Sequence, residues 1–490
     1  MRARPQYPPR ALLALGTVAL LASCSGDTPT SADADPASMA VASASGFSIC
    51  HRTGTTGTII QVSASELVMH LKQGDYLTSL FVSQEPGQPS DEAHFRHIGD
   101  AYGAARDGRL ARGELQSGAC RITITVATGV YRGTDDVANT DKKLEHFPFV
   151  VDVPDVTLHG ALVMGLDASG RATGAGATQA ATTLSPIAPL SHECCDALFF
   201  VVGDPAGSAG NGFTVEGFVL RSGSAPGTGA AGFGLLAFEV NNLLVQGNRL
   251  EGFFETLDLR GSSGVLKANH LSGGGQCDVC IAGPGTYRVA DNRILAGGTH
   301  GIFASPAIDS DPSIAPTSEI VADIVNNEVR DHRQLPISAG IRIGAVGLNA
   351  PDVHGTSHIT VRDNLLVNNS FGLMIDALFP QPDTELRGDV DLTTSGNVVR
   401  QSCQADLLVA FTRHRTALGS GDDPYLRNST YQLTLGGDLP FSDAWFSNPG
   451  GLGNTLLVNG HAIGHITRQF FDPDSCPGAT LATAQAAEAR

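Results

Sequence analysis

The chain has 490 residues, with 49 acidic and 31 basic side chains and a formal net charge of −18 at pH 7. Such an acidic chain is a poor partner for nucleic acid, and it would repel other polyanions unless a cation or a basic pocket intervened. Its 58 glycines, and apolar residues that sit in short β-branched runs between Gly, Asn and Asp, indicate β-structure with many tight turns.

An apolar run near the N-terminus predicts a signal peptide. The run, Ala11–Ala22, follows three arginines and is too short to cross a bilayer. It ends in Leu21-Ala22-Ser23-Cys24, which resembles the bacterial lipobox; the alternative is an ordinary signal peptide with a coincidental cysteine. The resemblance implies a signal peptide over residues 1–23, lipidation at Cys24 and a flexible tether over 24–45. The protein would then sit on the bacterial cell envelope, at the outer membrane or cell surface, touching the membrane only through its lipid.

Residues 46–119 are expected to form an N-terminal cap region. Its first part, "CHRTGTTGTIIQVSASELVMHLKQGD" at 50–75, contains Ser63-x-x-Glu66, a capping box that predicts a short helix ending before Gly74. The segment resembles a Cys-His…His-Leu-x-x-Gly-Asp motif of exported bacterial proteins, a resemblance that implies no activity. His51, His70 and Asp75 could bind a metal, and the alternative is a disulfide-stabilised cap.

An Asn-x-apolar pattern recurs through the middle of the chain. Its asparagines are Asn248, Asn269, Asn292, Asn327, Asn364 and Asn397. A second pattern, apolar-x-apolar, drifts in step with it and is centred on Leu236, Asp258, Cys280, Phe303, Arg342, Met374 and Leu408. A repeat of roughly 22 residues with strand-like period and no helical signature predicts a parallel β-helix. The asparagines would occupy the same turn in each coil and hydrogen-bond to the coils on either side.

With these repeats, the chain resembles the right-handed parallel β-helix proteins of the pectin-lyase-like superfamily over roughly residues 120–470. "HIGDAYGAAR" at 97–106 predicts an amphipathic helix, and "ITITVATGVYRG" at 122–133 follows it as strands. This order is similar to the start of pectinesterase-type β-helices, in which a helix caps the open first coil. We expect an all-β solenoid with an N-terminal helical cap, the β-helix at 120–423, and final coils with a C-terminal cap at 424–490.

Nine cysteines are present, and lipidation of Cys24 would leave eight. An even number in an exported protein indicates disulfides, and proximity along the chain favours Cys50–Cys120 and Cys403–Cys476. The alternative for the others is a zinc cluster of Cys277 and Cys280 with His192, Cys194 and Cys195.

Three successive coils carry about eleven extra residues each at one corner, at 305–318, 345–357 and 377–391. These loops should stack into a wall beside the outer face of one sheet, and function concentrates on such loops. Strand alternation also places Thr256, Arg260 and Asp376 outward. The expected cleft floor is Asp258, Asp278, Phe303, Arg342 and Asp376, with His300 at its edge. The wall offers Asp309, Asp311, Asp352, His354, Asp383, Glu385, Arg387 and Asp389.

Two chemistries fit this cleft. Paired carboxylates could cleave a glycosidic bond, or calcium on Asp309, Asp311 and Asp383 could hold a uronate while Arg342 removes a proton. The candidate catalytic residues are therefore Arg342, Asp376, Asp258, Asp278 and His300. The structural alternative is a solvated acidic surface with Arg342–Asp376 as a plain ion pair.

Departures from known enzymes weigh against catalysis. "THGIFAS" and "GIRIG" are only faintly similar to polygalacturonase elements, since Thr299 replaces a glycine and Gly344 a lysine, and other family motifs are missing. We therefore expect a monomeric envelope lipoprotein that binds or cleaves an extracellular polysaccharide, chiefly by analogy of fold. The main alternative is a non-catalytic surface, adhesion or structural protein, and a third is a metal- or redox-active module at the Cys/His clusters. No cofactor other than calcium is expected.

Overall fold

The computed structural model describes residues 46–53, 56–85, 91–113, 120–134, 141, 143–173, 181–190, 196–203, 210–223, 232–306, 317–334, 338–345, 354–377, 387–411, 426–437, 444–447 and 451–464. The predicted signal peptide, Cys24 and the tether lie outside these residues and stay predictions. Neither of the helices found in the described ranges is long and apolar enough to cross a membrane.

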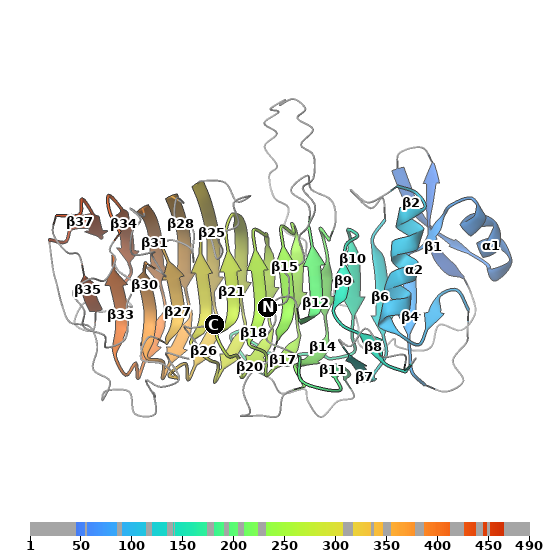
Figure 1. The fold of residues 1–490 in the computed structure, drawn as a ribbon, viewed down its shortest axis with the longest axis horizontal. Coiled ribbons are helices and arrows are strands. Elements are labelled where there is room, and N and C mark those ends of the chain that lie inside the picture. The colour runs from blue at the N-terminus through green and yellow to red at the C-terminus, as the bar shows by residue number, and fades with distance from the viewer. Residues whose placement is uncertain are drawn as a thin grey trace, which may run out of the picture. The chain divides into compact units, whose positions relative to one another are not determined.

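Each repeat of the chain forms one coil of three short parallel strands (Figure 1). In a typical coil β15 (Phe233–Phe238) is followed by β16 (Leu243–Gln246) and β17 (Arg249–Glu251), and the next coil begins with β18 (Glu255–Arg260). Corresponding strands of successive coils pair in parallel, as β15 does with β18 and β16 with β19. The chain is therefore a parallel β-helix, as its repeat predicts.

The corresponding strands of successive coils form three long sheets, which we call B, C and D; sheet A belongs to the cap region. Sheet B contains, in spatial order, β37 (His461–Ala462), β36 (Thr455–Val458), β34 (Thr430–Leu435), β31 (Arg387–Ser395), β28 (His354–Arg362), β25 (Thr317–Val325), β22 (Gly285–Ala290), β19 (Gly264–Lys267), β16, β13 (Thr214–Glu216), β10 (Val156–His159), β6 (Ile122–Val126), β4 (Ser79–Val82) and β5 (His94–Phe95).

Sheet C contains β32 (Val398–Arg400), β29 (Leu365–Val367), β26 (Glu328–Arg330), β23 (Arg293–Leu295), β20 (His270–Ser272), β17, β14 (Phe218–Arg221), β11 (Thr182–Pro186), β7 (Gly129–Thr134) and β8 (Glu145–His146). Sheet D contains β35 (Ala444–Ser447), β33 (Ala405–Ala410), β30 (Phe371–Asp376), β27 (Ala339–Gly344), β24 (His300–Ser305), β21 (Cys277–Ala282), β18, β15, β12 (Ala197–Val202) and β9 (Phe149–Val151).

The core lies inside the coils and is built from stacked columns of apolar side chains. Along sheet D one column consists of Leu235, Leu257, Val279, Ile302, Ile341, Leu373 and Leu407, all of them buried. Burial of such side chains is worth about 1.5–3 kcal/mol each, and the stack repeats this gain in every coil.

The recurring asparagines form one continuous hydrogen-bonded ladder between sheets B and C. Nδ2 of each of the first five donates to Oδ1 of the next asparagine; Asn269 Nδ2, for example, donates to Asn292 Oδ1 at 3.0 Å, and Asn292 Nδ2 to Asn327 Oδ1 at 2.9 Å. The second hydrogen of Asn292 Nδ2 is donated to the Leu266 carbonyl, at 2.9 Å. The ladder is buried, which confirms the structural role predicted for these residues.

The N-terminal end of the stack is covered by α2 (Ile98–Leu110), which packs against the first strands of sheet B (Figure 1). Its predicted apolar face of Ile98, Ala101, Tyr102 and Ala105 is buried. The buried Glu145 carboxylate accepts hydrogen bonds from the Ile98 and Gly99 amides, where the positive end of the helix dipole favours an anion. The predicted helical cap is thus confirmed.

Ahead of this helix lies a small antiparallel sheet A of β1 (Phe47–Thr53), β2 (Thr56–Val62) and β3 (Tyr76–Leu77), with α1 (Ala64–Lys72) between β2 and β3. Helix α1 begins with the predicted capping box of Ser63 and Glu66 and ends before Gly74. The predicted Cys50–Cys120 disulfide joins β1 to the first coil. At the other end of the stack β36 pairs with β37 in an antiparallel hairpin.

The ladder makes a prediction about stability. Asn292→Ala removes four buried hydrogen bonds, which join its side chain to Asn269, Leu266 and Asn327, so the free energy of unfolding should fall by about 3 kcal/mol or more. Asn241→Ala is the matched control, because Asn241 is exposed in the turn before β16. This variant should change the free energy of unfolding by no more than about 0.5 kcal/mol. Urea unfolding followed by circular dichroism measures both, and equal losses would contradict the ladder's role.

Candidate functional site

The outer face of sheet D carries the predicted floor residues. The register of the sheet aligns one residue from each strand into the expected row, which runs Leu236, Asp258, Cys280, Phe303, Arg342, Met374 and Leu408. The core column of the same strands points the opposite way, so this row faces outward as alternation predicts. All of these side chains are nevertheless buried.

Every strand in this part of sheet D has a kink at its second residue. Phe233 pairs with Glu255 and Leu235 with Leu257, whereas Gly234 and Thr256 between them do not pair. In the next strand the Cα atoms of Cys277 and Cys280 are only 5.8 Å apart, where an extended strand would separate them by about 10 Å. The kink places both residues on the outer face, and they form a disulfide.

Arg342 lies at the centre of a buried charged cluster. Its Nε and Nη2 donate to the two carboxylate oxygens of Asp376, at 2.9 and 2.6 Å, and its Nη1 donates to Nε2 of His300, at 2.8 Å. Burial, with the Arg342 guanidinium and His332 nearby, holds the pKa of His300 well below its ordinary value of 6.5. Since arginine can only donate, Nε2 accepts and the proton of the neutral ring is on Nδ1.

A second cluster surrounds Asp258, on β18. Nη2 of Arg260 is 2.7 Å from Asp258 Oδ2 and 3.8 Å from Glu255. β18 and β27 are separated by β21 and β24, so the two clusters lie about 14 Å apart along the stack at the usual strand spacing. We call the two clusters together, Glu255, Asp258, Arg260, His300, Arg342 and Asp376, the polar centre.

Apolar groups border the polar centre at both ends of the same face. On one side are Ala197, Phe200, Phe233, Leu236 and Phe238; on the other are Ala339, Phe371, Met374, Ala405, Leu408, Ala410 and Trp445. Phe200, Phe238 and Trp445 are the half-buried members of these groups. The rings of Phe200 and Phe238 meet edge to face at a centroid distance of 5.8 Å, and Trp445 meets Phe371 in the same way.

The prediction that Asp278 and Thr256 face outward is wrong, because both occupy the kink position. In other strands the same position is occupied by Gly234 and Gly301, and a Cβ atom added to either glycine would point at core residues. The Thr256 hydroxyl donates to Asp278 Oδ1 at 3.2 Å, and Asp278 Oδ2 lies 3.8 Å from Nε2 of the fully buried His332. Asp278 therefore belongs to the interior of the coil, apart from the other floor residues.

The predicted wall is partly a continuation of sheet B. Strands β25, β28 and β31 have nine residues each, whereas β16 and β19 have four, so the extra segments are strand and not loop at their C-terminal ends. At the start of these strands Asp389 binds His354, at 2.8 Å, and Arg387, at 3.1 Å. The other wall residues, Asp309, Asp311, Asp352, Asp383 and Glu385, lie outside the described residues, so the calcium site stays a prediction.

The cysteine predictions have mixed outcomes. Cys277 and Cys280 are bonded to each other, which contradicts a zinc-thiolate cluster at these two residues. His192, Cys194 and Cys195 lie outside the described residues. Cys403 is disulfide-bonded. Cys476 lies outside the described residues, so the pairing of these two cysteines stays a prediction.

The sequence reasoning missed three features of this face: the kink, the Cys277–Cys280 disulfide and the pairing of Arg260 with Asp258. Glycine at 234, 301, 340 and 372, always one residue before the apolar-x-apolar pattern, was a signal for the kink, since glycine inside a strand marks irregular backbone.

These features define a parallel β-helix protein with a buried polar centre on one outer sheet. No protein-family model matches the sequence, and no curated protein matches it significantly. Among solved structures it is similar to the A-module of the Azotobacter vinelandii mannuronan C-5 epimerase AlgE6, with 15% identity over 74% of this chain and 94% of that one and a TM-score of 0.39.

It is also similar to a rhamnogalacturonan lyase, with 13% identity over 76% of this chain and 87% of that one and a TM-score of 0.43. A third similar structure is the catalytic unit of a GH87 α-1,3-glucanase from Streptomyces thermodiastaticus, with 17% identity over 81% and 70% and a TM-score of 0.36. Similarities at this level do not bear on activity.

The buried Asp278 predicts a pH dependence of stability. Burial raises its pKa from 3.8 to about 7, so between these values the folded chain holds a proton that the unfolded chain has released. The contribution of Asp278 is therefore largest below pH 4 and is lost as the pH rises to 7. Asp278→Asn, which imitates the protonated acid, should raise the free energy of unfolding more at pH 8 than at pH 5.

Urea unfolding at both pH values measures this difference. The pKa of His332 is lowered to about 4 by burial and gives the opposite trend, so only the comparison of wild type with Asp278→Asn isolates the carboxyl group. Asp323→Asn, at a partly exposed carboxylate on sheet B, is the control. An equal effect of Asp278→Asn at the two pH values would contradict the raised pKa.

Proposed function

We propose that the protein is an envelope-anchored lipoprotein that binds, and in the stronger form of the proposal cleaves, an extracellular polysaccharide on the outer face of sheet D. The observation that carries the proposal is the polar centre, a set of fixed polar groups, all buried except the half-buried Arg260, between two apolar groups on one face. Ligand sites typically combine apolar and aromatic surroundings with a few well-placed polar groups.

Two atoms of the polar centre keep unused hydrogen-bonding capacity. Within the described ranges, neither Asp258 Oδ1 nor His300 Nδ1 has a hydrogen-bond partner, although both are buried. Leaving such groups unpaired costs roughly 1–3 kcal/mol each, which a ligand that pairs them would recover. One offers an acceptor and the other an N–H donor, and a sugar hydroxyl can serve either.

The half-buried aromatic rings at the two ends of the face supply a second element of sugar recognition. Phe200 and Phe238 lie on β12 and β15, and Trp445 lies on β35, so they are on opposite sides of the polar centre along the stack. A chain of sugars running across the coils would meet an aromatic ring before and after the charged groups.

The same geometry favours binding over cleavage by the predicted residues. Asp258 and Asp376 are four strand spacings apart, about 19 Å, whereas glycosidase carboxylates lie about 5–9.5 Å apart. Arg342 binds both oxygens of Asp376 through Nε and Nη2, and a guanidinium offers only donors and no acceptor atom for a substrate proton. Cleavage would therefore need groups beyond these three.

The test is binding to a panel of neutral and acidic polysaccharides, with and without calcium. Absorbance near 235 nm for unsaturated products and reducing ends are read in parallel. The double variant Arg342→Gln/Asp376→Asn removes both charges while keeping polar side chains of similar size, and it should weaken binding at least tenfold. Arg288→Gln/Asp323→Asn, which removes a cross-coil ion pair on sheet B, is the matched control and should leave binding unchanged.

Equal binding by the two double variants would move the ligand site away from the polar centre. Folded wild-type protein that neither binds nor cleaves any member of the panel would favour the non-catalytic surface or structural alternative.

A further inference from the structure

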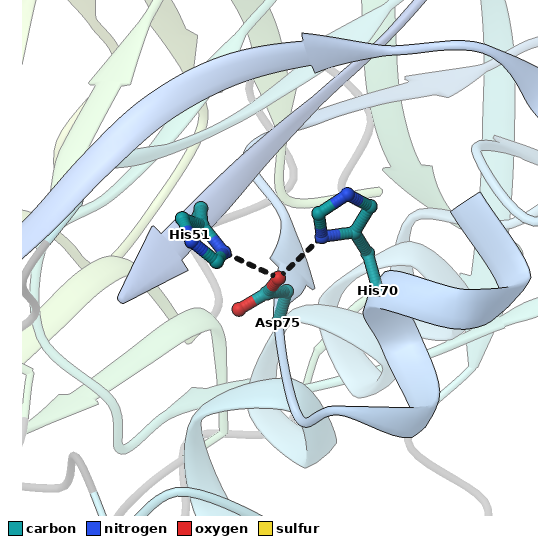
Figure 2. Close-up of side chains that lie close together, drawn as sticks. All are labelled: His51, His70 and Asp75. Carbon is teal, nitrogen blue, oxygen red and sulfur yellow. Dashed lines mark hydrogen bonds and ion pairs between the residues drawn. The ribbon is translucent and has the colours of Figure 1, made fainter. Parts of the chain in front are cut away.

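Three potential metal ligands converge in the cap region, away from the polar centre. His51 lies on β1, His70 in the last turn of α1, and Asp75 just before β3 (Figure 2). β1 pairs antiparallel with β3 through Cys50 and Tyr76, which brings His51 beside Asp75. The backbone turns back at Gly74, whose φ of +86° suits glycine, and the Asp75 amide then donates to the His70 carbonyl at 3.0 Å.

The ligand atoms of these side chains point at one another (Figure 2). Nδ1 of His51 is 2.9 Å and Nδ1 of His70 is 2.7 Å from the same oxygen, Oδ2 of Asp75. The three atoms all lie within 4.8 Å of one another. The two rings are edge to face, with centroids 5.5 Å apart, so neither blocks the other's approach to a shared point.

The second oxygen of the carboxylate is held separately. Arg112 donates from Nη2 to Asp75 Oδ1 and from Nε to the Gly74 carbonyl. Hydrogen-bonded partners of this kind orient metal-ligating carboxylates in known sites and leave one oxygen for the metal. Arg112 also adds a positive charge that lowers the affinity for a cation. Binding therefore has to rely on the two imidazole nitrogens as well as on the negative charge of Asp75.

We propose that His51, His70 and Asp75 form a binding site for one divalent transition-metal cation of the zinc class. Two imidazole nitrogens and one carboxylate oxygen suit zinc, which binds such ligands at about 2.0–2.2 Å and takes water in a fourth position. The cation would take the place of the two hydrogen bonds that join the rings to Oδ2. Tetrahedral ligands at such bond lengths are about 3.3 Å apart, so the ligand atoms need to separate by roughly half an ångström.

The surroundings allow that small movement without dismantling the site. Asp75 is buried and fixed by Arg112, whereas the side chains of His51 and His70 are 35% and 15% exposed and can be reached from solvent. The Cys50–Cys120 disulfide, next to His51, anchors β1 to the first coil. A bound cation would tie β1, α1 and β3 together, which makes it a stabilising element of the cap region that is independent of polysaccharide binding.

The experiment is zinc titration of full-length, chelator-treated protein by calorimetry, with cobalt(II) as a spectroscopic probe. We expect one tight equivalent of zinc, a rise in the midpoint of thermal unfolding when zinc is added, and visible cobalt bands of a four-coordinate site. His51→Ala and His70→Ala should each weaken this binding at least 100-fold, and Asp75→Asn tests the carboxylate with little change in shape.

His94→Ala is the matched control, because His94 makes a similar bond to Asp91, with Nδ1 2.6 Å from Oδ1, but has no second histidine. It should bind zinc as wild type does. Circular dichroism checks folding, and zinc-induced shifts of two histidine signals in the NMR spectrum of the wild type give a readout that needs no variant. Absence of a stoichiometric zinc site in the folded wild type, or binding that survives in both histidine variants, overturns the proposal.

Discussion

The structure depends on the registration of each coil on the one before it. Parallel backbone pairing repeats between every pair of coils, and the buried asparagine ladder permits only one alignment, because each amide must meet the next. A slip by one residue would orphan these buried groups and turn the core column outward. Registration therefore makes neighbours of residues far apart in the chain, such as Glu255 and Cys277, 22 positions apart, and His300 and Ala339, 39 positions apart.

That constraint explains the character of the outer face of sheet D. A side chain on this face has fixed neighbours in the coils before and after it, so a charge there is tolerated only if an adjacent coil or strand position supplies its partner. Arg342 finds Asp376 one coil on and His300 one coil back, while Asp258 finds Arg260 on its own strand. Such pairing rigidifies the groups, and rigid polar groups in apolar surroundings are suited to recognising a ligand.

Much of this could be predicted from the sequence because a repeat has few degrees of freedom. The period gives the coil, the apolar columns give the inner face, and the recurring asparagine identifies one turn; α1 and α2 were predictable from local capping and amphipathic signals. The inward direction of the Asp278 side chain was not predictable, because one unpaired residue in each strand of sheet D locally shifts the alternation of inward and outward side chains. The repeat already separates Asp258 from the strand of Asp376 by four coils, so grouping these two carboxylates in one catalytic site was the second error. Neither error affects the fold, since both concern single positions on a correctly placed sheet.

The central claim, that coil registration brings Arg342 against Asp376, is tested most directly by a double-mutant cycle on the free energy of unfolding. The cycle uses Arg342→Met and Asp376→Leu, singly and together. The account predicts a coupling of about 1–3 kcal/mol between these residues, 34 positions apart in sequence. It predicts additivity, within about 0.5 kcal/mol, for the cycle of Arg342→Met with Asp258→Leu, about 14 Å apart along the stack. Equal coupling in both cycles, or none in the first, would contradict it.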